Sequence, residues 1–360
     1  MSPRAGASRT PRARTTAAGT RARVEGMAAS WSRRLRPALP YLFGGAILVA
    51  LVLLAQPSLL VVAARRFDPI YAPVIAGLAL AYYMLQGARW VPLLRAVGIR
   101  APVPQVLLLN LAGQSTGLLP GGELTRALLV SEVAKVEVGE VVATITVQEL
   151  IYNLLILAVA MAGALHGPLT AAGVGAALGA MVLALTVLTV EPLFALATRL
   201  VGAIPIARRV VPDLRDVRRD TIRLLRRWDT LGWSGLSILQ VGVTVTMFWV
   251  VVRALDPGRL GWEDAALVYA VAHLAGAVSF SPGGLGGFEG VCIALLLSFG
   301  LPLQVGVAAA LIQRAGDKGL GTVFGIAAYI FARHRYRLKA SRVVRHGQRP
   351  AGGQGTGSRS

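Results

Sequence analysis

The chain has 360 residues, of which 55% are hydrophobic and only 15% charged, and its mean hydropathy is +0.62. This composition excludes an ordinary water-soluble domain and predicts an all-α polytopic membrane protein. The formal net charge of +20 does not indicate a nucleic-acid partner, because its arginines gather in the two tails and one loop, where they favour cytoplasmic placement beside lipid headgroups.

Two basic tails flank the apolar part of the chain. Residues 1–39 carry nine arginines and one acidic residue, and residues 334–360 are rich in arginine, glycine and serine. Neither tail can bury a core, so we expect both to be disordered and cytoplasmic. Between them we expect one transmembrane domain in the cell membrane, residues 40–333, whose halves (40–190 and 231–333) are joined by a basic cytoplasmic segment at 199–230.

Apolar windows of about 20 residues or more predict the full membrane spans, because each can cross roughly 30 Å of hydrocarbon, and several of them, such as 70–88 and 168–190, contain no charge at all. Two other apolar regions are broken into arms too short to cross twice, and they predict re-entrant hairpins whose broken backbone faces protein or a wet cavity. The expected order contains six spans, at 41–64, 70–88, 141–165, 168–190, 231–255 and 302–332, and two hairpins, at 103–133 and 265–299.

The two hairpin breaks share a sequence pattern. Each has Pro-Gly-Gly followed by a glutamate, Glu123 in the first and Glu289 in the second, and the hairpins are expected to enter from opposite faces. This predicts an inverted repeat of the kind that holds a transporter's substrate near the midplane, although glycines in membrane helices also serve close packing. The residues of the breaks are Pro120, Gly121, Gly122, Pro282, Gly283, Gly284, Gly286 and Gly287.

Six charged residues lie within or beside the predicted membrane segments. Each costs on the order of 2.5 to 3.5 kcal/mol on insertion scales, so each needs a partner or a function. One interpretation is that Glu–Arg pairs lock the hairpins against the spans. The other is a polar cavity in which arginines hold a phosphate and carboxylates meet an amine or hydroxyls. The candidate substrate-binding residues are Glu123, Arg126, Glu149, Glu289, Arg314 and Asp317.

Arg314 ranks first among these residues, because a guanidinium cannot relieve its cost by losing a proton. We expect its partner to be Glu289 or Glu149, with Asp317 bracing it along its own helix. His273 has no spaced partner and is expected to be hydrogen-bonded rather than to relay protons. No metal-ligand spacing, phosphate-binding loop or nucleophile motif is present, so we expect no metal, no cofactor and no enzymatic activity.

The ordered motifs resemble a known family. They are Leu-Pro-Gly-Gly-Glu-Leu-Thr-Arg at 119–126, Glu149, Ser-Pro-Gly-Gly-Leu-Gly-Gly-Phe-Glu at 281–289, and Gln313-Arg314. Over roughly residues 41–332 the chain is similar to the flippase-like transmembrane region of lysylphosphatidylglycerol synthases, a family that includes stand-alone membrane proteins. The resemblance implies a region that moves lipid between leaflets, without the lysyltransferase domain. The chain departs from the family pattern at Glu149-Leu150, where the family often has Glu-Arg.

Three functions are open on the sequence. The first is a flippase-like transporter that moves a phospholipid or lipid-linked headgroup, anionic or zwitterionic, between leaflets. The second is a non-transporting membrane protein, with a homo-oligomer or an envelope-lipid enzyme as partner, that scaffolds or regulates that enzyme. The third, a membrane-embedded transferase, is the weakest, because no nucleophile and base stand at a recognisable spacing.

Overall fold

A computed structural model describes residues 67–117, 123–164, 189–202, 235–279 and 284–336, with shorter pieces between residues 65 and 232. Every regular element within these residues is a helix, as the composition predicts. Several predicted features lie outside the described residues: the first span, most of the fourth span and of the basic segment, residues 1–39 and 337–360, and the break residues Pro120, Gly121, Gly122, Pro282 and Gly283.

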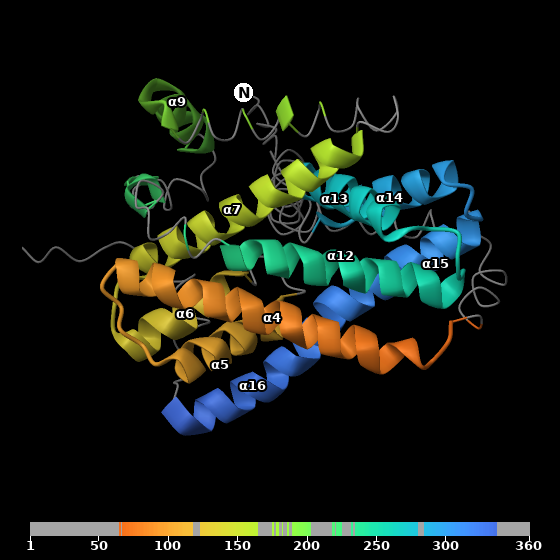
Figure 1. Ribbon diagram of the computed structural model, residues 1–360. Coiled ribbons are helices and arrows are strands. Elements are labelled where there is room, and N and C mark those ends of the chain that lie inside the picture. The colour runs from red at the N-terminus through yellow and green to blue at the C-terminus, as the bar shows by residue number, and fades with distance from the viewer. Residues whose placement is uncertain are drawn as a thin grey trace, which may run out of the picture.

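Three long helices form the middle of the molecule: α4 (Tyr71–Ala96), α7 (Val138–Ala164) and α12 (Gly235–Leu255). Helix α4 packs along α12, and α7 contacts both (Figure 1). Among the described helices, two are long and apolar enough to cross a membrane by length and composition, α7 and α12.

Helix α4 continues beyond the expected end of the second span at residue 88, and this extension carries a buried arginine. Arg89 directly follows the predicted end of this span, and the residue is only 4% exposed in the structure. It donates to the Gln148 carbonyl oxygen at 2.9 Å and to the Gln240 side chain. The next residue, Trp90, donates to Thr144 Oγ1 at 2.7 Å. These hydrogen bonds from α7 and α12 stabilise polar groups that the sequence alone assigns to the membrane surface.

Two pairs of shorter helices occupy the positions of the predicted hairpins. In the first pair, α5 (Val103–Gly113) is prolonged by a 3-10 turn (Gln114–Thr116) and packs against α6 (Glu123–Ala134). In the second, α13 (Trp262–Val278) packs against α14 (Gly287–Ser298). The apolar residues of each pair belong to a different hydrophobic cluster, and each cluster also includes residues from the other half, such as Tyr152 with the second pair and Ala328 with the first.

The last predicted span is a nearly continuous helical run in three parts. Helix α15 (Leu303–Arg314) is followed by a π-helical turn (Ala315–Gly319) and by α16 (Leu320–Tyr336). Helix α15 packs on α14 and α12, whereas α16 packs on α5 (Figure 1, blue). The run therefore connects the two short helix pairs, and the widened turn coincides with the charged residues that interrupt the span.

A further described helix leads into the basic segment. Helix α9 (Glu191–Gly202) begins where the fourth span was expected to end. Arg218, from the basic segment, forms an ion pair with Glu191, donates to the Thr189 carbonyl oxygen at 3.0 Å and lies 5.0 Å from the Phe194 ring centroid. This part of the basic segment is therefore packed on the start of α9.

Glycines allow close approach of the two arms in each short pair. A Cβ atom on Gly113 would lie 2.7 Å from the Cα of Arg126, and one on Gly287 would lie 2.6 Å from the Cβ of Ser279. Gly284 and Gly286 have φ angles of 70° and 82°, which L-residues with a side chain rarely adopt. The packing role of these glycines is thus visible in the contacts, whereas a role in exposing backbone groups to a passage stays a prediction.

Replacing Gly287 with alanine is expected to destabilise the protein by about 1–3 kcal/mol, because the added methyl overlaps Ser279 and the Ala275 carbonyl oxygen. Thermal unfolding of the purified protein in detergent measures the effect. Gly290→Ala, in the same helix, is the matched control, since a Cβ there meets nothing within 4 Å and alanine favours the helix. Equal melting temperatures for the two variants would show that the contact does not limit the packing.

Candidate functional site

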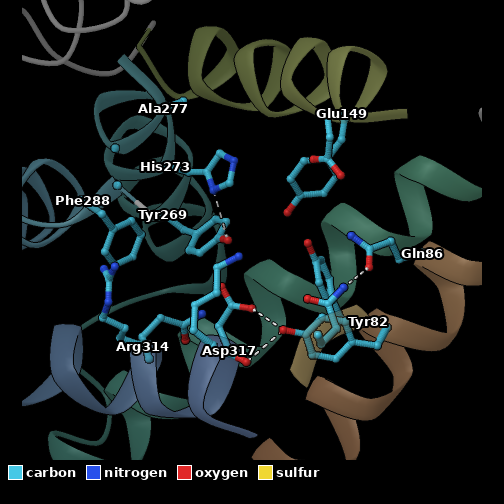
Figure 2. A pocket seen from close by; sticks show the side chains of 16 residues that line it. Tyr82, Gln86, Glu149, Tyr269, His273, Ala277, Phe288, Arg314 and Asp317 are labelled. Carbon is cyan, nitrogen blue, oxygen red and sulfur yellow. Dashed lines mark hydrogen bonds between the residues drawn. The ribbon is translucent and has the colours of Figure 1, made fainter. Parts of the chain in front are cut away.

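A cavity of about 180 Å³ lies between α4, α7, the second helix pair and the π turn. Four charged residues line it: Glu149, Arg314, Asp317 and Lys318. Figure 2 shows Glu149 and Arg314 on opposite sides of this space. Three of the six sequence-predicted site residues are thus brought to one cavity by helices from both halves of the chain.

In the second half, Glu289 stands behind Arg314. It lies in the first turn of α14 and is completely buried. One of its carboxylate oxygens accepts a hydrogen bond from the Gly286 amide at 2.7 Å, and the other forms an ion pair with the Arg314 guanidinium. Of the two partners that the sequence offers for Arg314, the structure shows Glu289. This ion pair connects α14 to the end of α15.

In the first half, Arg126 of α6 stands behind Glu149 of α7. The Arg126 side chain is 1% exposed, and its Nη2 lies 2.7 Å from the Glu149 carboxylate. Its Nη1 donates to the side-chain oxygens of Gln148 at 3.3 Å and Asn110 at 3.4 Å, and its guanidinium lies 5.5 Å from the Trp90 ring centroid. Helix α6 thus supplies an arginine to Glu149, whereas the adjacent position in α7 is Leu150.

Each half of the chain contains one ion pair between a short helix and the helix that follows it, but the acidic and basic partners are exchanged between the two halves. In the first half the short helix carries the arginine and the following span the glutamate, and in the second half the short helix carries the glutamate. In each pair the residue from the short helix is buried, and the residue from the span lines the cavity. The sequence analysis matched Glu289 with Glu123, because both glutamates follow a Pro-Gly-Gly break. In the structure, the residue of the first half that takes the role of Glu289 in an ion pair is Arg126. Glu123 is the first residue of α6, and its side chain lies outside the described part.

The π turn carries Asp317 and Lys318 into the cavity wall. The Tyr83 hydroxyl, from α4, donates to the Asp317 carbonyl oxygen at 3.0 Å and approaches its carboxylate at 3.4 Å. Gly321 makes room for this contact, because a side chain there would overlap the Tyr83 ring. The structure therefore shows Asp317 bound to α4, whereas its bracing of Arg314 stays a prediction.

An aromatic wall completes the cavity, and sequence reasoning missed it. Centroid distances are 6.3 Å for Tyr82–Tyr152, 5.5 Å for Tyr152–His273, 5.7 Å for Tyr269–His273 and 5.9 Å for Tyr269–Phe288. The Tyr269 hydroxyl lies 3.5 Å from His273 Nδ1. A signal was available, since tyrosine carries a polar tip that needs a partner in the middle of an apolar span.

Gln313 is a further cavity residue that was not among the predicted site residues. It precedes Arg314, lines the cavity and is 2% exposed. Neither its side-chain oxygen nor its side-chain nitrogen has a hydrogen-bond partner among the described residues. A buried amide without partners costs free energy, so the cavity contains polar groups that a ligand would satisfy.

The described residues form only helices, two of which have membrane length and apolar composition, and these helices enclose a charged cavity. They define a helical membrane protein with an internal polar site. Comparison with protein families agrees with this class. The chain belongs to the family described as the lysylphosphatidylglycerol synthase TM region, whose model matches residues 41–325. It is therefore a membrane protein of a family associated with lipid metabolism. No curated protein matches the chain.

Proposed function

We propose that this protein is a flippase-like transporter that moves a phospholipid or a lipid-linked headgroup between membrane leaflets. The observation that carries the proposal is the shared cavity, into which the first half directs Glu149 and the second half Arg314. Charged groups inside a membrane protein are costly and commonly mark a substrate pathway. A lipid headgroup is a polar ligand that such a family would meet in its own membrane.

The proposed topology places both termini and the basic segment in the cytoplasm, with the two short helix pairs as re-entrant hairpins of an inverted repeat. Two observations support it: each pair has its own hydrophobic cluster, and the corresponding ion pairs join each pair to the next span. A headgroup phosphate would share Arg314 with Glu289, so binding would weaken the contact between hairpin and span. The proposal includes no chemical step, cofactor or metal.

Leaflet-resolved lipid labelling tests the proposal directly. The purified full chain is reconstituted into vesicles with a trace of fluorescent phospholipid, and a membrane-impermeant reductant bleaches the outer leaflet. Movement between leaflets is expected to exceed that in protein-free vesicles, seen as a larger bleachable fraction over time. Equal bleaching in both preparations would remove the transport proposal and favour the non-transporting interpretation.

Arg314→Lys is expected to leave the protein folded and to reduce transport at least about tenfold, because lysine keeps the charge opposite Glu289 but loses the planar two-pronged donor for phosphate. Transport and melting temperature are measured on the same preparation. Arg259→Lys is the control, since Arg259 is exposed and contacts Asp256 and the Gly300 carbonyl oxygen. Normal transport by Arg314→Lys would make Arg314 a structural ion-pair residue only.

A further inference from the structure

The charges of the residues that line the cavity add up to zero, but a carboxylate and a guanidinium lie on opposite sides of it. Glu149 and Arg314 line it from opposite sides (Figure 2), and each forms an ion pair with a buried residue, Arg126 and Glu289 respectively. Each pair is neutral, and the other two charged lining residues, Asp317 and Lys318, add one charge of each sign. Since complementary potentials favour binding, such a cavity suits a ligand that is itself neutral and dipolar.

The carboxylate side of the cavity has the features of an ammonium site. Tyr152 follows Glu149 by three positions in α7 and therefore lies on the same helix face. Its ring is next to those of Tyr82 and His273, which also line the cavity. An ammonium group is attracted by aromatic faces and by a carboxylate that remains accessible, and the Glu149 side chain is 42% exposed.

The guanidinium side has the features of a phosphate site. The Arg314 side chain is 17% exposed and lines the cavity. Next to it, the buried Gln313 amide has no hydrogen-bond partner among the described residues. A phosphate oxygen would accept from this amide and from the guanidinium together, and so would satisfy an amide donor that has no partner within the described part of the chain.

From this polarity we infer that the cavity selects a zwitterionic headgroup, a phosphodiester joined to one ammonium group, with the phosphate at Arg314 and Gln313 and the ammonium between Glu149 and the tyrosines. The inference rests on the proposed function and narrows its substrate class. It assigns Gln313 as a phosphate-binding residue beside Arg314, and Tyr82 as a residue that determines specificity for the ammonium beside Glu149.

Binding to the purified full chain in detergent tests the inference without requiring transport. The probes are short-chain phosphatidylethanolamine, which has the ammonium, and short-chain phosphatidylglycerol, which replaces it with hydroxyls. The ethanolamine lipid is expected to bind at least about fivefold more tightly. Soluble phosphoethanolamine is a third probe: competition with the lipid places the recognition in the headgroup, and its failure to compete would overturn the inferred site.

Substitutions test which residues bind the ammonium and which bind the phosphate of the headgroup. Glu149→Gln is expected to bring the affinity ratio of the two lipids close to one, whereas Glu140→Gln, in the first turn of the same helix, keeps the wild-type ratio. Tyr82→Leu provides a second test of the ammonium end if Glu149→Gln does not fold. Gln313→Met is expected to weaken binding of both lipids and to raise the melting temperature, because it removes a buried amide without partners.

The outcomes separate this inference from the transport proposal. Selective binding of the ethanolamine lipid without movement between leaflets supports the inferred site and removes the transporter. Movement between leaflets with equal affinity for the two lipids overturns the inferred selectivity and leaves the transporter in place. A wild-type ratio in both Glu149→Gln and Tyr82→Leu would also overturn it.

Discussion

Replacing Arg314 with methionine is expected to destabilise the protein by about 3–5 kcal/mol, because the change leaves the Glu289 carboxylate buried without its guanidinium. Chemical unfolding of the detergent-solubilised protein measures the loss, and reduced expression should accompany it. The cost comes from Glu289 rather than from Arg314, since water cannot reach a side chain that is 0% exposed.

A double variant identifies that cause. Glu289→Gln removes the charge but keeps an oxygen that accepts from the Gly286 amide. Added to Arg314→Met, it is expected to recover most of the lost stability, because a buried ion pair replaced by neutral groups of similar shape costs little. Transport should remain absent in this folded double variant if Arg314 contacts the headgroup. A double variant as unstable as Arg314→Met alone would contradict the assignment of the cost to Glu289.

In the ion pair of the first half, removing the glutamate is expected to cost more stability than removing the arginine. Glu149→Ala leaves Arg126 buried without a carboxylate, and the expected loss is about 3 kcal/mol, the low end for a buried charge, because Gln148 and Trp90 still contact the guanidinium. Arg126→Met is expected to cost less, because Glu149 borders the cavity and its charge can be hydrated there.

Unfolding free energies of Glu149→Ala and Arg126→Met, measured side by side, check this order. The cavity-facing residue should be the more costly one to remove in both halves, glutamate in the first and arginine in the second. A larger loss for Arg126→Met would mean that its hydrogen bonds and packing exceed its electrostatic role. Glu140→Ala, in the same helix as Glu149 and away from the cavity, is the control for loss of an acidic residue.

The amino-acid sequence by itself determined the class of structure. An apolar composition with few charges is enough to predict membrane helices, and the Pro-Gly-Gly breaks mark where α5, α6, α13 and α14 begin or end. The charged residues of the candidate site were also recognisable, since each one interrupts an apolar run and needs a partner there. These features depend on neighbouring residues along the chain, so the sequence displays them directly.

Only the tertiary structure decided which of these residues meet. The ion pair of Arg126 with Glu149 and that of Glu289 with Arg314 each join two successive helices, and the burial of Arg89 between α7 and α12 joins helices far apart in the chain. The aromatic wall, and the Gln313 amide that no described residue hydrogen-bonds, likewise depend on how the helices pack. The spacing of residues along a helix shows which of them share a face. Which other helix packs against that face depends on the arrangement of several helices together.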